Sequence, residues 1–260
     1  MTKEIPSARR ELIASRLLAG EAVSSTALAS EFAVSEDAVR RDLRALAAQG
    51  TCRRVYGGAV PIGAGSTPIA ARLSEDSEEK RALAKAAMTL ISPGSFVFID
   101  NGSTNVLAAE FLPDDAELSV ATNSVHAAAR LATRQDVPFV LLGGGVDLAI
   151  GGCVDGTAIE ALSRLNIDLC LLGACAVSVE RGASAFDAAD AAFKRALVGR
   201  SRCTVVLVSN DKLTATAPFT VADLDSIDHI VLSHDAPSSQ VAELERAGAK
   251  ILRAAAPQTN

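Results

Sequence analysis

Six short apolar runs after residue 95 constrain the fold more than any other feature, because helix-like segments separate most of them. The runs are 96–99, 118–121, 139–142, 169–172, 205–208 and 230–232, and the helix-like segments lie near 103–112, 124–133, 156–165 and 187–198. Buried strands that alternate with helices predict an α/β fold with a mainly parallel sheet. A chain of 260 residues, 49% of them apolar, buries a sufficient core without disulfides. Its five scattered cysteines are therefore expected to be small buried apolar residues.

The first sixty residues have a different pattern, with three short helices followed by a hairpin. The first helix is expected over Ser7–Ala19, where Leu12, Ile13 and Leu17 form one stripe. The second follows an N-cap at Ser24 or Ser25, and the third follows an N-cap at Ser35. The segment 61–73 is rich in Gly, Pro, Ser and Thr, so we expect a linker there, before a new helix that opens at Ser74.

The third helix has two unlike faces. Val39, Leu43, Leu46 and Ala47 fall on one side, and Arg40, Arg41 and Arg44 on roughly the other. A helix of this kind can lie in a DNA major groove, where arginine reaches phosphates and guanine edges. The alternative is an ordinary solvated face, supported by the (i, i+4) pairs Glu36–Arg40 and Asp37–Arg41.

The segment after this helix favours the DNA-binding alternative. Residues 51–60 are typical of a hairpin with a Gly57-Gly58 turn, and they carry Arg53, Arg54 and Tyr56. A basic ribbon behind such a helix is suited to contact the phosphate backbone. Charge agrees, because residues 1–60 have a net charge of +2 and residues 61–260 a net charge of −8.

The motif from Val34 to Leu43, followed by Gly50 and by Arg54-Val55-Tyr56-Gly57-Gly58-Ala59, resembles the DeoR-type winged helix-turn-helix. Ala38 replaces the threonine that is usual in this family, and Tyr56 replaces its frequent histidine. The resemblance implies a DNA-binding domain over 1–60, with the helix-turn-helix at about 25–44. The DNA-contacting residues that it implies are Ser24, Ser35, Arg40, Arg41, Arg44, Arg54 and Tyr56.

Three polar segments follow consecutive apolar runs in the second part of the chain. They contain Asp100, Gly102, Ser103 and Thr104; then Thr122, Asn123 and Ser124; then Gly143, Gly144 and Gly145. Ligands of parallel sheets gather at the carboxyl ends of the strands, and amides and hydroxyls there can hold a phosphate. A glycine turn or a capping residue explains any one segment alone, but the three together favour an anionic ligand.

These segments, with Gly173-Ala174, Lys194 and Lys212, resemble the DeoR C-terminal sensor domain, which is similar in fold to ribose-5-phosphate isomerase. We expect this domain over 74–254. The resemblance implies a phosphorylated sugar as effector, bound by the residues of the first two segments together with Gly143, Gly144, Lys194 and Lys212. Two positions depart from the family pattern, since Leu213 stands for the usual Phe and Asp190 for the usual Glu.

The isomerase likeness raises an enzymatic alternative. The isomerases carry three carboxylates in a cluster after one strand, whereas this chain has Cys175, Ala176 and Ser178 at those positions. We therefore expect a sensor without enzymatic activity or cofactor, in a homo-oligomeric repressor of a sugar operon that binds double-stranded operator DNA. A DNA-binding head on a pure dimerisation domain is the third alternative, which the polar segments disfavour.

Two further features bear on location and metal binding. The charged N-terminus has no apolar signal region, and the longest uncharged stretch, 55–71, holds four Gly and two Pro. We therefore expect a soluble cytoplasmic protein. Asp228, His229, His234 and Asp235 are separated by a predicted strand, so we expect no metal site there.

Overall fold

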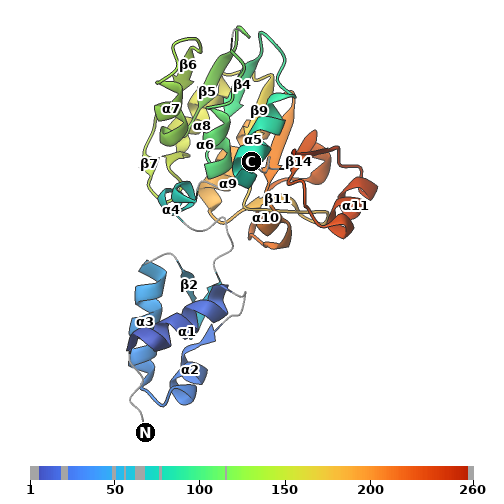
Figure 1. Ribbon diagram of the computed structural model, residues 1–260. Coiled ribbons are helices and arrows are strands. Elements are labelled where there is room, and N and C mark those ends of the chain that lie inside the picture. Colours follow the sequence, from blue (N-terminus) through green and yellow to red (C-terminus); the bar gives the residue numbers. More distant parts are fainter. Residues whose placement is uncertain are drawn as a thin grey trace. The chain divides into compact units, whose positions relative to one another are not determined.

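The computed structural model divides into two units, residues 1–67 and 68–260 (Figure 1). It describes residues 6–18, 23–48, 51–55, 57–61, 68–75, 78–114 and 116–256. Each unit has its own apolar core, so each is described by itself.

The first unit is a three-helix head with a small antiparallel sheet. Its helices are α1 (Pro6–Leu18), α2 (Ser25–Glu31) and α3 (Glu36–Ala48). Its strands are β1 (Val23–Ser24), β2 (Cys52–Val55) and β3 (Gly58–Pro61), in the order β1-β3-β2. The core holds Ile13, Leu17, Leu28, Val39, Leu43 and Leu46, with one stripe from each helix. This arrangement confirms the winged helix-turn-helix.

Two serines set where the helices of the head begin. Ser24 is the N-cap of α2, since its Oγ accepts from the Ala27 N–H at 3.4 Å, while Ser25 is buried. Ser35 Oγ accepts from the Ala38 N–H at 3.3 Å, directly before α3. Both side chains satisfy backbone donors that the first helical turn leaves without partners.

The second unit is built on a seven-stranded sheet in the order β15-β14-β12-β9-β4-β5-β6, and every neighbouring pair is parallel. The strands are β4 (Phe96–Ile99), β5 (Ser119–Thr122), β6 (Phe139–Leu141), β9 (Leu169–Leu172), β12 (Thr204–Val208), β14 (His229–Leu232) and β15 (Ile251–Arg253). The expected α/β fold with a parallel sheet is confirmed. In the ranges described, no helix is long and apolar enough to span a bilayer.

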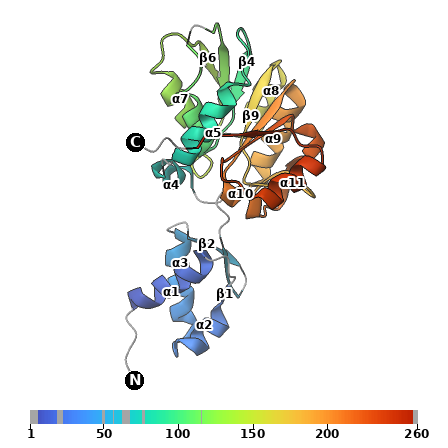
Figure 2. The same cartoon turned by 45° about the vertical axis from the view of Figure 1, so that its right-hand side comes forward.

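Helices cover both faces of this sheet (Figures 1 and 2). On one side are α5 (Glu78–Met88), α6 (Ser103–Ala108) and α7 (Val125–Leu131), with Val97 and Ile99 of β4. On the other are α8 (Gly156–Ser163), α9 (Ala188–Arg200) and α11 (Ser238–Arg246), with Phe98. Successive residues of a strand point to opposite faces, so each apolar run supplies both cores.

Several elements were not expected from the apolar runs. An antiparallel sheet contains β10 (Ala176–Ser178), β11 (Gly182–Ala185) and β13 (Phe219–Ala222), and β7 (Val146–Asp147) pairs with β8 (Gly152–Cys153). Two short helical segments, α10 (Asn210–Thr214) and the 3-10 turn Leu224–Ser226, flank β13. These strands are short or rich in small residues, so they produce no apolar run.

The segment 61–73, expected to be a linker, differs from that expectation in its second half. Residues Ile69–Ser74 form helix α4 of the second unit, and α5 begins at Glu78 rather than at Ser74. The Ile69 side chain is buried, and its N–H donates to the Ala149 carbonyl at 2.9 Å. Burial of this one apolar residue attaches the segment to the domain that follows it.

Candidate functional site

The outward face of α3 carries the three arginines that the sequence placed there. Arg40, Arg41 and Arg44 are exposed, while the opposite face is buried in the core of the head. Arg40 also bonds Glu36, with Nη2 and Oε2 2.9 Å apart, and Arg41 Nε donates to the Asp37 carbonyl at 3.3 Å. Of the two expected (i, i+4) ion pairs, Glu36–Arg40 is present, whereas the Asp37 carboxylate lies 3.8 Å from Arg40 Nη1 instead. The arginine face remains open to solvent.

Asp42, inside the same helix, is a buried residue that sequence reasoning did not single out. Its carboxylate lies against Arg9 of α1, with Nη2 and Oδ2 2.5 Å apart, and 3.4 Å from Nε of Arg10. Both Arg9 and Asp42 are under 10% exposed. This ion pair holds α3 against α1 and therefore fixes which side of α3 presents its arginines.

The wing is the antiparallel pair β2–β3, in which Arg54 lies opposite Ala59 and Val55 opposite Gly58. The structure describes the backbone of Arg54. Tyr56 lies outside the described residues. The basic strand thus follows directly after α3 in the chain, as the DNA-binding interpretation requires.

In the second unit, the carboxyl ends of four parallel strands bring the polar segments to one edge of the sheet. Asp100 follows β4, Thr122 ends β5, Gly143 comes two residues after β6, and Gly173 follows β9. Parallel pairing of β9-β4-β5-β6 makes these segments neighbours.

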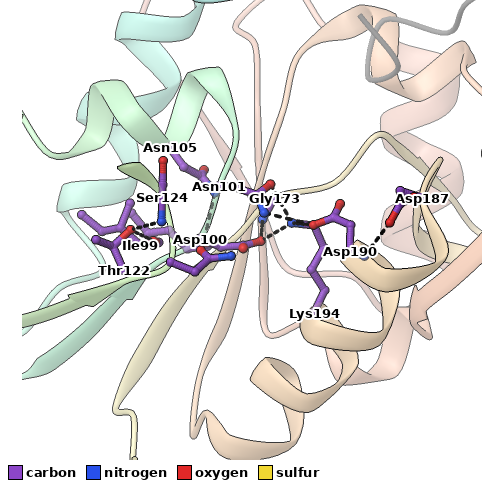
Figure 3. Close-up of polar contacts among 12 residues, drawn as sticks. Ile99, Asp100, Asn101, Asn105, Thr122, Ser124, Gly173, Asp187, Asp190 and Lys194 are labelled. Carbon is purple, nitrogen blue, oxygen red and sulfur yellow. Dashed lines mark hydrogen bonds and ion pairs between the residues drawn. The ribbon is translucent and has the colours of Figure 1, made fainter. Parts of the chain in front are cut away.

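Lys194 of α9 reaches this edge and is buried there among polar side chains (Figure 3). Its Nζ lies 2.6 Å from Asp100 Oδ2, 3.0 Å from Asp190 Oδ1 and 3.0 Å from Asn101 Oδ1. Burial alone lowers the pKa of Lys194, but the Asp100 and Asp190 carboxylates raise it above its usual value. Lys194 is therefore a charged group enclosed by its own partners.

Gly173 makes this enclosure possible. Its N–H donates to Asp100 Oδ2 at 2.8 Å, and a Cβ at this position would lie 2.2 Å from the Asn101 carbonyl oxygen and 3.2 Å from Lys194 Nζ. Only glycine allows the β9 end to approach so closely. The role expected for Lys194, direct countercharge to a phosphate, thus conflicts with two carboxylates already neutralising it.

Several oxygens at this edge are buried and lack hydrogen-bond partners among the described residues. They include Asp100 Oδ1 and Asn123 Oδ1. Burial raises the pKa of Asp100, and Lys194 opposes that shift. Ser103 and Thr104 are buried residues as well, and no hydrogen bond of their hydroxyls is found within the described ranges, but these oxygens are not among the fully buried unpartnered atoms. A buried polar atom without a partner costs free energy, which a ligand or ordered water recovers.

Two other predicted ligand residues have structural hydrogen bonds. Thr122 Oγ1 donates to the Ile99 carbonyl at 2.6 Å and accepts from the Ser124 N–H at 3.0 Å. Ser124 Oγ accepts from the Ala127 N–H at 3.2 Å and so caps α7. Their hydroxyls hold the β5–α7 turn, which leaves Asn123 as the side chain of this segment with an unpartnered buried oxygen.

The glycine loop after β6 also has a structural explanation. Gly144 has a φ of +140°, and a Cβ there would lie 2.4 Å from Asp155 Oδ1. Asp155 caps α8 and also accepts from the Gly145 N–H at 2.7 Å. These bonds lower the pKa of Asp155. Gly143 and Gly144 are exposed, and their loop lies against the N-cap residue of α8. Their ligand role stays a prediction.

Lys212 on α10 lies in a cationic neighbourhood that sequence reasoning missed. Burial lowers its pKa to about 8, with Asp211 opposing the shift and the positive charges of Arg72 and Lys80 adding to it. Arg72 belongs to α4. Burial lowers its pKa, and the nearby Cys175 and Asp190 oppose that shift. Arg72 lies in the segment that was expected to be a linker. Only the folding of the chain brings it near Cys175, just after the end of β9.

Lys80 ties α4 to the rest of this neighbourhood. Its Nζ donates to the Arg72 carbonyl in the last turn of α4, at 2.9 Å, and to the carbonyl of the C-cap residue Glu75, at 2.7 Å. A lysine at this end of a helix interacts favourably with the helix dipole.

In the part of the chain that the structure describes, no group of three His, Cys, Asp or Glu residues could hold a metal ion.

A helix with outward arginines, a wing and a polar strand-end site define a DNA-binding regulator with a separate sensor domain. Residues 9–63 match the model of the DeoR-like helix-turn-helix domain, and residues 75–234 match that of the DeoR C terminal sensor domain. The chain belongs to the DeoR family of transcriptional regulators.

Several curated relatives are named as repressors. The glycerol-3-phosphate regulon repressor of Escherichia coli K12 is 29% identical over 84% of this chain and 86% of that protein. A putative aga operon transcriptional repressor of Escherichia coli O157:H7 is 28% identical, over 95% and 93%. The transcriptional repressor GlcR of Bacillus subtilis is 29% identical, over 84% and 85%.

Solved structures give more distant matches. A probable sor operon regulator from Shigella flexneri is 12% identical, with a TM-score of 0.40 over 65% of this chain and 90% of that one. A ribose-5-phosphate isomerase in complex with phospho-erythronic acid is 18% identical, with a TM-score of 0.39 over 53% and 54%.

Proposed function

We propose that this regulator represses genes of sugar or polyol catabolism and is released from its operator by a phosphorylated sugar or polyol. The names of its relatives, which include repressors of a glycerol-3-phosphate regulon and of an aga operon, support this class of target. DNA is read by α3 and by the β2–β3 wing. The effector binds at the strand ends of the second unit.

The observation that carries the proposal is that a free carboxylate oxygen and a group of cations lie at the same edge of the sheet. Asp100 offers a buried carboxylate oxygen without a partner among described residues, which suits a sugar hydroxyl. Lys212 and Arg72 bring positive charge to the same region, around Cys175. Because residues 61–260 have a net charge of −8, a phosphate needs such a local concentration of cations.

Each residue then has a distinct role. Lys212 and Arg72 bind the phosphate, and the hydroxyls of Ser103 and Thr104 donate to it. Asp100 accepts from a hydroxyl of the sugar, while Lys194 keeps Asp100 oriented. This assignment differs from the expected role of Lys194 because its ammonium group is already enclosed by carboxylates.

Release of DNA requires an effector that favours one arrangement of the chain over another. Arg72 lies on α4, which follows residues 62–67 in the sequence, and Lys80 bonds the end of the same helix. Binding of phosphate by Arg72 therefore acts on the first helix after the inter-domain segment. This is the proposed route by which occupancy reaches the head.

The isomerase alternative lacks a suitable base. The two carboxylates at the β9 end, Asp100 and Asp190, are both bonded to Lys194, and Cys175, Ala176 and Ser178 supply none. Proton abstraction beside a carbonyl needs a positioned base that is able to accept a proton. We infer that the domain senses its ligand without transforming it.

A thermal-shift screen of sugar and polyol phosphates, including glycerol 3-phosphate, tests the effector class. An effector present at 100 times its Kd stabilises the protein by about 2.7 kcal/mol. We expect Lys212→Met to abolish the shift, whereas Arg164→Met, at an exposed pair with Glu160 on α8, keeps it. Equal shifts in both variants would refute the proposed phosphate site, and no shift with any phosphate would refute the effector class.

A further inference from the structure

Exposed apolar side chains are concentrated in one segment of the second unit. Of the large apolar side chains that its described residues expose, all but Phe219 lie between residues 125 and 148. They are Val125, Val140, Leu141, Val146 and Leu148, with exposed fractions from 39% to 85%. Apolar groups collected in this way mark an interaction surface more often than scattered ones do.

This segment includes an edge of the main sheet. β6 is the last strand in the order, next to β5, and no described strand pairs with its outer side (Figure 1). The Leu142 N–H donates to the Thr122 carbonyl, and the Pro138 carbonyl accepts from the Val120 N–H. Backbone groups alternate in a parallel ladder, so those of Val140 face β5 and those of Phe139 and Leu141 face outward.

The part of this segment that contains β6, residues 137–146, is uncharged. Asp136 and Asp147 flank the stretch, and residues 61–260 have a net charge of −8. A surface that meets its own copy across a twofold axis places like charges opposite each other. An uncharged strip on an acidic domain is therefore where self-association avoids repulsion.

The strand at the opposite edge of the sheet, β15 (Ile251–Arg253), differs from β6 because charged residues lie on it and next to it. β15 ends with Arg253, whose Nη1 donates to the His234 carbonyl at 3.1 Å, and Lys250 precedes the strand. Charged residues on an edge strand discourage pairing with another chain. β6 carries no such residue, so it needs another means of covering its edge.

We propose that a second copy of this chain covers it, with the two β6 strands antiparallel about a twofold axis that passes by Val140. Phe139 then lies opposite Leu141 of the second copy and exchanges backbone hydrogen bonds with it. Val140 lies opposite Val140 of the second copy as a pair without hydrogen bonds, with Cα atoms about 4.5 Å apart.

The flanking apolar residues complete the interface. A stable dimer buries about 800 Å² on each partner, more than a three-residue strand provides. Further exposed apolar side chains of this segment are Val146 on β7, Leu148 directly after it, and Val125 at the start of α7, the helix that packs against β6. A dimer formed in this way carries two heads, as recognition of paired half-sites requires.

Val140→Asp tests the surface, because it places two carboxylates opposite each other at the axis. Val140 is 53% exposed, so the fold tolerates the change. We expect wild type to be a dimer of the 26.8 kDa chain or a multiple of it, and Val140→Asp to weaken dimerisation by roughly 100-fold or more. Phe219→Asp, at an exposed position of β13, is the control and leaves dimerisation unchanged. Sedimentation equilibrium measures all three.

Val140→Cys gives a second readout that does not depend on disruption. Non-hydrogen-bonded antiparallel pairs have a Cα separation within the disulfide range of about 4.4–6.8 Å. We expect mild oxidation to cross-link Val140→Cys chains into covalent dimers, and Phe219→Cys chains not to cross-link. A monomeric wild type, a Val140→Asp dimer of unchanged strength, or absence of the cross-link would each overturn the proposal.

The inference rests on the proposed function only because recognition of paired half-sites requires two heads. The β6 interface and the effector site can be disproved separately. If β6 is the wrong surface, Val140→Asp stays dimeric while effector-induced thermal shifts persist. If the effector site is wrong, the shifts are absent while Val140→Cys still cross-links.

Discussion

Arg9 and Asp42 join the first helix of the head to its DNA-reading helix, with Arg9 Nε donating to Asp42 Oδ2 at 2.7 Å. The pair is 33 residues apart in sequence and almost fully buried. Asp42 sits between Arg41 and Arg44, so its attachment to α1 fixes the rotation of α3 about its axis. The arginine face is thereby held outward.

Asp42→Ala should destabilise the head strongly, since it leaves the Arg9 guanidinium buried without its partner. Removal of one member of a buried ion pair costs about 3–5 kcal/mol. Chemical denaturation measures the free energy of unfolding, with Glu31→Ala as control, because the Arg16–Glu31 pair is exposed and should matter far less. Equal effects of the two substitutions would contradict the anchoring role of Asp42.

Arg41→Ala should weaken operator binding by about 1–3 kcal/mol if the side chain reads a base. Arg40→Ala and Arg44→Ala should weaken it as well. If the arginine contacts a phosphate, its loss reduces the slope of log affinity against log salt concentration by about one unit. Binding is followed by mobility shift on DNA that the protein selects from a random pool. Arg164→Ala is the matched control, and unchanged affinity in all three head variants would reject α3 as the reading helix.

Effector affinity should fall as the pH rises through about 8, because the pKa of Lys212 is lowered to about 8 and an anion needs the protonated form. Lys212→Arg stays charged throughout, so its affinity should be flat from pH 7 to about 9.5. Isothermal titration calorimetry compares the two proteins. A parallel decline in both would mean that another group titrates.

The same group affects stability in a defined direction. The folded pKa lies below the ordinary value of 10.5, so the unfolded chain holds more protons between about pH 8 and 10.5. The contribution of Lys212 to the free energy of unfolding therefore rises with pH across that window. Lys212→Met should remove this rise.

Gly144→Ala should lower thermal stability, whereas Gly143→Ala should not. Alanine at a φ of +140° is strained by about 1–3 kcal/mol, and its Cβ would displace the Asp155 cap. A Cβ on Gly143 would meet no described atom within 4 Å. Differential scanning calorimetry separates the two, and equal stability would show that the loop does not depend on Asp155.

Much of the fold could be predicted because its signals are local. The run 169–172 coincides with β9, since a central strand covered on both faces is apolar at every position. The run 118–121 is one residue out of register with β5, which ends at Thr122. A buried threonine whose hydroxyl bonds the neighbouring strand belongs to the strand, although it does not extend an apolar run.

The candidate site was harder to predict because its contacts are long-range. Lys194 and Asp100 were both identified, but 94 residues separate them, and nothing local indicates that one neutralises the other. The Gly and Pro residues that precede Arg72 predict a linker there, whereas the burial of Ile69, which attaches α4 to the domain, is a tertiary effect. Sequence pattern located the strand ends, whereas packing decided which charges meet there.

Operator binding with and without the effector, in wild type and in Thr104→Val, tests the central claim most directly. Thr104 is buried and its hydroxyl makes no hydrogen bond within the described ranges, so valine should preserve the fold and the affinity for DNA. We expect the phosphorylated effector to release wild type from DNA and to require at least about tenfold more ligand for Thr104→Val, as expected for a lost hydrogen bond to a charged group. Equal release of both proteins at the same effector concentration would contradict a sensor site at the end of β4.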